Sequence, residues 1–370
     1  MEAAAPPRKA LAGTAWRAIA ASRAASILLL ASFFWMVAAA ACAGFLGKWG
    51  LRDDAPRFTI ERMLDGTAYR PFVYRQLVPL IANAADRALP APVKRSIADH
   101  LSPEPTFTRT IGLFTPGLRF RYVVVCYLSF AALFGSLFVL RLIALDTGAT
   151  PLAALLAPVS LVLALPYLQT RGGYFYDCAE LFFLSLAFLL ALRGKALWLI
   201  ALVVPAALNK ESFFFFLPAL YPLLRTRLPR GRAAAATAAG LLVAGAVALW
   251  LEHAFAASPG GAIELHLLDN LPTLATPHAY RETELTYGII GPSGLSFAAL
   301  AIASIVATRG AAACPPAVRH HLSVAAAINL PLLLALGVVG ELRDLSLLFV
   351  GFMVLLATSL GTPDRKGSSS

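Results

Sequence analysis

The stretch ALWLIALVVPAALNKESFFFFLPALYPLL, residues 196–224, carries Lys210 and Glu211 between two strongly apolar runs. Each run has only about 13–14 residues, which form about 20 Å of helix against a hydrocarbon core of about 30 Å. Basic residues flank both runs, since Lys195 precedes the first and Arg225 follows the second. The pattern predicts a short helical hairpin whose charged tip ends inside the membrane and faces a polar cavity open to the outside.

The alternative for this stretch is one broken helix, kinked at Pro205 and Pro218. A single helix would invert the orientation of every later segment and would place strongly basic segments on both sides of the membrane. Because lysine and arginine collect on the cytoplasmic side, we prefer the hairpin.

The composition of the whole chain is that of a membrane protein. Of its 370 residues 59% are hydrophobic and 14% are charged, whereas a soluble domain has about 45–50% apolar and about 25% charged residues. We therefore expect an all-α fold, a polytopic transmembrane bundle of about ten spans. The candidate spans lie near 24–46, 122–143, 150–169, 176–192, 196–209, 212–224, 233–257, 289–307, 322–339 and 345–361.

The net charge of +11 is distributed as a topology signal, which argues against a nucleic-acid surface. The segments between spans that are expected to be cytoplasmic, with both termini, hold 15 of the 31 basic residues. The short outer loops hold only four, Arg171, Lys210, Arg281 and Arg343. By the positive-inside rule, we predict that the N-terminus and the C-terminus are both cytoplasmic. As a separate expectation, we place the protein in a bacterial inner membrane.

The expected organisation is a cytoplasmic segment 1–23, a bundle over 24–361 and a cytoplasmic tail 362–370. Within the bundle, 47–121 forms a large first periplasmic loop and 258–288 a second one, which could close over a substrate.

Two segments of the first loop, 77–89 and 92–101, have apolar residues at helical spacing. They are predicted to be amphipathic helices at the membrane interface, where they either border a site or simply cap the bundle.

Acidic and basic residues occur together in three short turns expected on the outer side, within RGGYFYDCAELFF, NKES and GELRDLS. Taken singly, such turns are ordinary interfacial charges. Ionisable groups near membrane depth are costly unless they face a polar cavity or one another, so we interpret the three turns as one site. Its residues are Arg171, Asp177, Glu180, Lys210, Glu211, Glu341, Arg343 and Asp344.

The layout of the chain resembles the GT-C superfamily of integral-membrane glycosyltransferases, which take a sugar from a polyprenyl-phosphate carrier at the outer face of the membrane. One span leads to a large outer loop with acids near its start. A bundle follows, whose middle, YDCAELFFLSLAFLLALRGKALWLIALVVPAALNKESFFFFLPALYPLLR, alternates apolar runs with an arginine turn and a lysine-acid turn. The segments YRPFVYRQLVPLI and GELRDLSLLF are also similar to bacterial members.

In that superfamily an acid shortly after the first span acts as the catalytic base, which implies Asp53 or Asp54 here, with Asp177 as a second candidate. Such a base takes the proton of the acceptor hydroxyl, while cations stabilise the departing phosphate. The cations expected at the site are Arg75, Arg171, Lys210 and Arg343. Glu180, Glu211 and Glu341 are expected to orient them or to bind sugar hydroxyls. Tyr176 is expected either to stack on the sugar or to belong to an interfacial aromatic belt.

A divalent cation, Mg²⁺ or Mn²⁺, is left open. Asp53, Asp54 and Asp177 could supply oxygen ligands, but no ligand spacing supports a metal site, so none is assigned.

We expect a glycosyltransferase that moves a hexose or pentose from a polyprenyl-phosphate carrier to a cell-envelope glycan, lipid or protein. One alternative is a transporter or flippase of a lipid-linked or anionic solute. It should show charges accessible from both faces and often an internal repeat, and neither is found. The other alternative is a polysaccharide polymerase or ligase. Such enzymes usually carry their large outer loop late in the chain, whereas 47–121 comes early.

Overall fold

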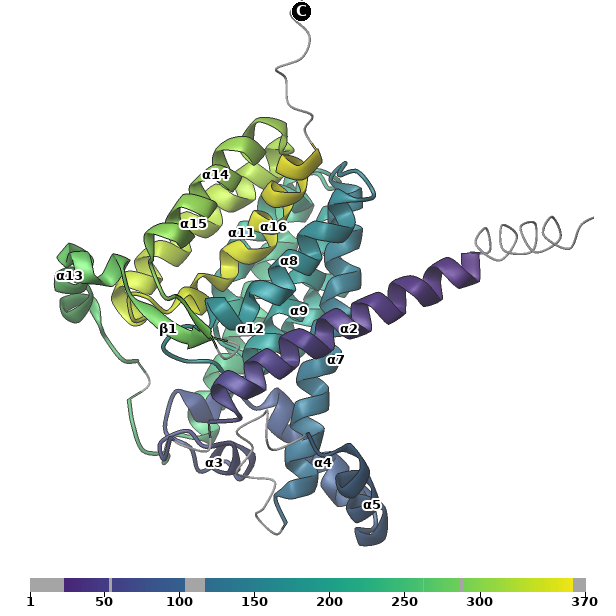
Figure 1. Ribbon diagram of the computed structural model, residues 1–370, viewed down its shortest axis with the longest axis vertical. Helices are drawn as coiled ribbons and strands as arrows, with labels where there is room; N and C mark the ends of the chain where they lie inside the picture. The colour runs from purple at the N-terminus through teal and green to yellow at the C-terminus, as the bar shows by residue number, and fades with distance from the viewer. Residues whose placement is uncertain (1–22, 53–54, 104–116, 262, 287–288, 362–370) are drawn as a thin grey trace, which may run out of the picture.

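The computed structural model describes residues 23–52, 55–103, 117–261, 263–286 and 289–361, which are mostly helical. Ten apolar helices form the bundle (Figure 1). They are α2 (Arg23–Trp49), α7 (Arg119–Asp146), α8 (Ala153–Leu168), α9 (Phe175–Leu192), α10 (Ala196–Asn209), α11 (Ser212–Leu224), α12 (Arg230–Ala254), α14 (Phe297–Ala313), α15 (Pro316–Leu336) and α16 (Ser346–Gly361).

Six of the described helical segments are long and apolar enough to cross a membrane. They are α2, α7, α9, α12, α15 and the segment Leu342–Gly361, which contains α16. The other four, α8, α10, α11 and α14, are apolar but shorter. The prediction of a polytopic helical membrane protein is therefore confirmed, and the ten helices occupy the ten predicted positions, whereas the number that cross the bilayer stays a prediction.

One predicted span begins too early. The span placed at 289–307 starts as a strand, β2 (Ile289–Pro292), which pairs antiparallel with β1 (Thr283–Thr286). The helix α14 begins only at Phe297, where the side chain of Ser296 accepts a hydrogen bond from the backbone N–H of Ala299 at 3.2 Å. The sequence GPSG at residues 291–294, which ends β2 and precedes α14, explains the difference, because Gly and Pro disfavour a continuous helix.

The stretch 196–224 forms a helical hairpin, so the alternative of one broken helix is wrong. The helices α10 and α11 are separated by Lys210 and Glu211, and Lys210 has an extended backbone with φ −161° and ψ 134°. The two far ends of the hairpin meet, since a Cβ on Gly194 would lie 2.7 Å from the Cβ of Arg227. The 14 and 13 residues of the two helices are the short lengths that the sequence indicated.

At one end of the bundle, turns that are far apart in sequence contact each other. The indole N–H of Trp49 donates to the carbonyl of Gln169 at 2.9 Å. The Nζ atom of Lys210 lies 3.4 Å from Oδ1 of Asp177. We call this the charged end, and it comprises residues 47–52, 72–76, 169–180, 209–212 and 337–346.

The opposite end is built from the other set of turns. Arg193 Nε lies 2.7 Å from Oδ2 of Asp146, which joins the end of α9 to the end of α7. The Thr358 hydroxyl lies 3.2 Å from the carbonyl oxygen of Gly310, which joins α16 to α14. We call this the basic end, and it comprises residues 146–151, 193–195, 225–232, 310–316 and 361.

The helix α9 lies at the centre of the bundle. In its most apolar 18-residue stretch 72% of the residues are buried, whereas the same measure for α12 is 22%. It contacts α7, α10, α11 and α16. Because α9 begins at Phe175, its central position brings the first turn of this helix into the middle of the charged end.

The first loop contains the two predicted helices, α4 (Leu77–Ala88) and α5 (Ala91–Leu101), together with a short helix, α3 (Ile60–Leu64). In Figure 1 these three helices lie below the bundle, with α4 and α5 beside the lower part of α7 and α3 further to the left. Val78 and Ala82 of α4 are buried, whereas Leu80 and Ile81 are more than 40% exposed. The helix therefore keeps an outward apolar surface, as expected of a helix at the membrane interface.

The second loop forms α13 (Leu267–Ala275) and the β1–β2 hairpin (Figure 1). Ion pairs attach it to the charged end. Arg171 Nη2 lies 2.8 Å from Glu282, and the ammonium group of Lys48 on α2 pairs with Glu284. These two ion pairs hold the second loop against the charged end of the bundle.

Cysteine labelling should place the two ends of the bundle on opposite sides of the membrane. Ser96→Cys, at an exposed position of α5, is expected to react from the periplasm with a membrane-impermeant maleimide, and Gly231→Cys at the basic end only after permeabilisation. The four native cysteines, Cys42, Cys126, Cys178 and Cys314, are buried, so the background should be low. The reverse pattern, or equal reaction at both sites, would refute the orientation.

Candidate functional site

The five most buried arginine, lysine, aspartate and glutamate residues in the described part of the chain belong to one cluster at the charged end. Their exposed fractions are only 4–8%, although they come from four separate segments. We define the charged cluster as Arg75, Asp177, Glu180, Lys210, Glu211, Glu341, Arg343 and Asp344. Charged side chains this close to membrane-spanning helices are costly, which makes the cluster the first candidate for function.

Lys210, at the tip of the hairpin, is held by two carboxylates of α9. Its Nζ atom lies 2.7 Å from Oε2 of Glu180 and 3.4 Å from Oδ1 of Asp177. Oε1 of Glu180 accepts hydrogen bonds from the hydroxyls of Ser212 at 2.6 Å and Ser346 at 2.8 Å. The lysine is thus enclosed in ion pairs, and the hairpin tip, α9 and α16 are tied together at Glu180.

Glu211 turns away from its neighbour Lys210 and pairs with Arg75. Two nitrogens of the guanidinium contact the two carboxylate oxygens, at 2.6 Å and 3.3 Å, which is the bidentate geometry that arginine favours. The same guanidinium bonds the hydroxyl of Tyr176 and lies 4.5 Å from the centroid of that ring. Arg75 is therefore fixed by three kinds of contact, while the Glu211 side chain remains 42% exposed.

Asp177 lies in the first turn of α9 and closes a capping box with Tyr174. Its Oδ2 accepts from the backbone N–H of Tyr174 at 3.0 Å and from the side-chain amide of Gln169 at 3.2 Å. Its Oδ1 faces Lys210 and also Arg343, the latter at 3.6 Å. Four donors thus surround this carboxylate, a setting that suits a structural anion better than a proton acceptor.

Arg343 lies in the short helix η4 (Leu342–Leu345), just before α16, and carries the third buried positive charge. Its guanidinium contacts Glu341 at 3.2 Å and Asp344 at 3.6 Å, and its central carbon lies 4.7 Å from the ring centroid of Tyr174. The preceding turn requires Gly340, whose φ of +99° side-chain-bearing residues rarely adopt.

Glu341 lies beside Arg343 and near two further carboxylates, and its surroundings shift its pKa. Burial raises the pKa of Glu341 to about 7. Arg343 opposes this shift, whereas Asp344 and Asp177 add to it, since a second negative charge nearby disfavours ionisation. A Cβ on Gly172 would lie 2.9 Å from Oε1 of Glu341, so the carboxylate reaches across to the segment before α9.

An aromatic wall lines one side of the cluster. The rings of Tyr174 and Tyr176 are stacked with centroids 5.0 Å apart, and Phe72 lies 5.6 Å from Tyr174. Trp49 lies close to the same turn, because a Cβ on Gly173 would be only 2.2 Å from its ring. Tyr176 is fully buried, so it acts on Arg75 and not as an open surface for a sugar.

The structure does not bring every predicted residue into the cluster. Arg171 faces the second loop and pairs with Glu282. Asp53 and Asp54 lie outside the described residues. The residue before them, Arg52, has its guanidinium carbon 5.2 Å from the ring centroid of Tyr174, which places the start of the first loop against the aromatic wall.

Sequence analysis missed three residues that shape the site: Arg52, Gln169 and Ser346. Arg52 directly precedes the pair Asp53-Asp54, and its position next to two candidate acids could have indicated a role in the site. Gln169 and Ser346 had no signal, because neutral polar residues at helix ends are common in any membrane protein.

No metal site is formed by the residues that the structure describes, since no group of three or more of their His, Cys, Asp and Glu side chains is arranged to hold an ion. Asp177, the one proposed ligand among them, is already surrounded by cations and amide donors.

Comparisons with protein-family models, with curated proteins and with solved structures find no match to this chain. The case for function therefore depends on the geometry of the charged cluster.

Proposed function

We propose that the chain is a membrane glycosyltransferase that moves a sugar from a polyprenyl-phosphate carrier to an acceptor hydroxyl at the periplasmic face. The observation that carries the proposal is the charged cluster, which places three buried cations and several carboxylates at one end of a helical bundle. A lipid-linked phosphate reaches such a site from the bilayer, while the acceptor arrives from water.

The cations suit the phosphate of the carrier. Arg75 and Arg343 each present a planar fork that binds two oxygens, and Lys210 supplies a point charge. All three are held by carboxylates and by Tyr174 or Tyr176. Such preorganised charges stabilise negative charge that develops in the transition state, because they need no rearrangement during the reaction.

The reaction needs one proton acceptor. The acceptor oxygen bonds to the anomeric carbon, the bond from that carbon to the phosphate oxygen breaks, and the hydroxyl proton goes to a carboxylate. The phosphate leaves on the carrier as an anion that pairs with the cations. The resemblance to the superfamily implies Asp53 or Asp54 as the base. Within the charged cluster we choose Glu341 as the candidate base, because burial raises its pKa to about 7.

A transporter is the weaker candidate because the buried charges lie at one end only. Between the charged end and the basic end the core is mainly apolar, with Phe188, Phe216 and Leu220 fully buried, although Ser136, Ser185 and His321 are buried there as well. A path for an anionic solute would need charged groups along the bundle. In the described part of the chain the buried charges stop at Glu180.

Binding of the carrier phosphate tests the proposal directly. Native mass spectrometry of the purified protein with undecaprenyl phosphate should show a bound lipid, and Arg343→Ala should weaken this binding about tenfold or more, because a charge-assisted contact contributes about 1.5–3 kcal/mol. Arg95→Ala, at an exposed position of α5 on the same side, is the matched control and should bind as the wild type does.

Two results would count against a carrier site in the charged cluster. One is equal loss of binding in both variants, which would mean that general surface charge attracts the lipid. The other is full binding by Arg343→Ala, which would place the phosphate elsewhere.

A further inference from the structure

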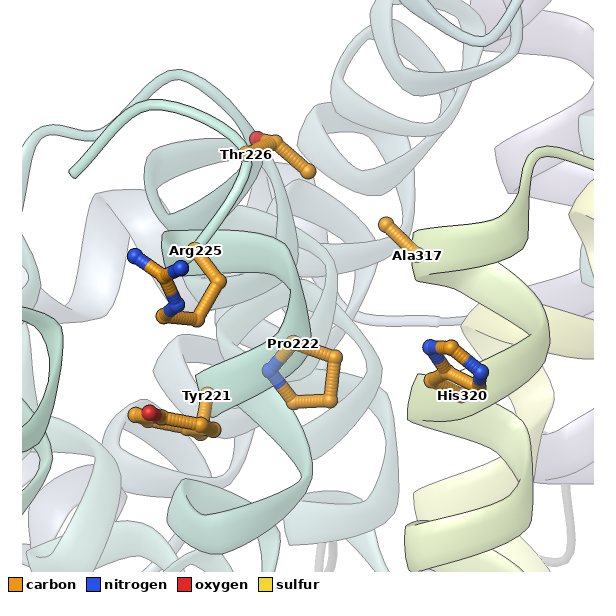
Figure 2. Close-up of a pocket in the computed structure, with 6 residues that line it drawn as sticks. All are labelled: Tyr221, Pro222, Arg225, Thr226, Ala317 and His320. Atoms are coloured by element: carbon orange, nitrogen blue, oxygen red, sulfur yellow. The ribbon is translucent and has the colours of Figure 1, made fainter. Parts of the chain in front are cut away.

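A shallow cavity of about 360 Å³, open to the surface, lies at the basic end between the last turn of α11 and the first turn of α15 (Figure 2). It is separate from the charged cluster, since α11 begins at Ser212 beside that cluster and ends at Leu224. At 1.5 Å per residue, the 13 residues of α11 put about 20 Å between the two places. The cavity is lined by Tyr221, Pro222, Arg225, Thr226, Ala317 and His320.

The lining combines an apolar floor with a basic rim. Pro222, Ala317 and the ring of Tyr221 supply carbon surface, while Arg225 and His320 lie on opposite sides of the cavity in Figure 2. More positive charge is close by, because the segment 225–232 has the sequence RTRLPRGR. A small apolar surface edged by an arginine and a histidine that can donate a hydrogen bond matches a molecule that is itself anionic at one end and apolar at the other.

Both helix ends at the cavity are fixed in place. Arg225 is the C-cap of α11, and its Nη1 donates to the carbonyl of Leu228 at 2.8 Å, which holds the guanidinium at the rim. The helix α15 begins with Pro316, so Ala317 lies in its first turn. Pro316 has no N–H, and the N–H groups of Val318 and Arg319 already donate to the carbonyl of Pro315 at 3.0 Å and 3.1 Å. The positive end of the α15 dipole still favours an anion here, as Arg225 does, and together they act against the negative carbonyl end of α11.

We propose that this cavity binds the headgroup of an anionic phospholipid, with the phosphate on the rim between Arg225 and His320 and the glycerol on the apolar floor. A lipid fits better than free phosphate, because most of the lining is apolar and the cavity lies where membrane helices end. Basic pockets between membrane helices on the cytoplasmic side bind anionic headgroups by this chemistry. The inference does not depend on the proposed glycosyl transfer, because it uses none of the residues of the charged cluster.

Lipid titration by native mass spectrometry tests the site, with phosphatidylglycerol as the probe and phosphatidylcholine as the zwitterionic reference. The wild-type protein should retain phosphatidylglycerol in preference, and Arg225→Gln should weaken its binding about tenfold or more, as expected when one charge-assisted contact is lost. The matched control is Arg232→Gln, an exposed arginine of the same basic segment that does not line the cavity, which should change binding less than twofold.

A second variant separates the cavity from the charge. Ala317→Phe fills the apolar floor and keeps Arg225 and His320, so it should also lose the preference for phosphatidylglycerol. Equal losses in Arg225→Gln and Arg232→Gln would overturn the proposal, since they indicate general attraction to the basic segment. Full binding by Ala317→Phe would overturn it too, as would displacement of the lipid by inorganic phosphate at millimolar concentration, which identifies a free-phosphate site.

Discussion

Replacing Glu341 with Gln should lower the rate of sugar transfer by about 10²–10⁴, the usual cost of losing a general base. Gln keeps the shape of the side chain and can still accept a hydrogen bond from Arg343, which lies 3.2 Å away in the wild type. Binding of undecaprenyl phosphate should therefore change little. The measurement is single-turnover transfer from a labelled lipid-linked sugar, with Glu264→Gln in the second loop as a control for an exposed glutamate.

The transfer rate and the stability of the protein should change with pH in opposite directions. A base must be ionised to accept a proton, so the transfer rate should rise with pH through about 7, the pKa to which burial raises Glu341. Stability runs in the opposite direction. Because the folded pKa lies above the ordinary value of 4.5, the contribution of Glu341 to stability is complete below about pH 4.5 and is lost as the pH rises through about 7. In Glu341→Gln both dependences should disappear.

The first-loop acids give the competing result. If Asp53→Asn or Asp54→Asn abolishes transfer while Glu341→Gln retains it, the base lies in the first loop, as the resemblance to the superfamily implies. If Asp177→Asn alone is inactive but folded, the second outer turn supplies the base, in spite of the four donors around that carboxylate. Full activity in all four variants would exclude a general base among these residues.

The sequence predicts the bundle well because membrane helices are specified by local composition. The ten apolar runs became ten helices, and the lengths of α10 and α11 agree with the prediction for residues 196–224. The small β1–β2 hairpin was not predicted, because Ile289 and Ile290 resemble the start of an apolar helix. The Gly-Pro-Ser-Gly sequence that follows them disfavours such a helix.

The pairing inside the charged cluster could not be predicted from sequence. Lys210 and Glu211 are adjacent in sequence and opposite in charge, which suggests that they pair with each other. In the structure Lys210 contacts Glu180, and Glu211 contacts Arg75. The reason is local, since Lys210 has an extended backbone, in which consecutive side chains point to opposite sides. Which carboxylate then meets each cation depends on contacts between residues 30 and 136 positions apart, and no short motif encodes those distances.

Replacing Lys210 with Met should lower the free energy of unfolding by about 3–5 kcal/mol, because removing one partner of a buried ion pair leaves an uncompensated charge. Here two carboxylates, Asp177 and Glu180, would lose their shared cation, and only Asp177 retains a second one in Arg343. Lys195→Met, an exposed lysine at the other end of α10, is the matched control and should change stability by less than about 0.5 kcal/mol. Unfolding in mixed detergent micelles measures both.

A double variant tells whether the loss comes from the stranded charge or from packing. Adding Glu180→Gln to Lys210→Met removes the carboxylate that loses its partner, while the amide oxygen can still accept from Ser212 and Ser346. Part of the lost stability should then return, and the two single changes should be strongly non-additive. If Lys210→Met is as stable as Lys195→Met, or if the double variant equals the sum of its parts, the hairpin tip does not depend on this ion pair.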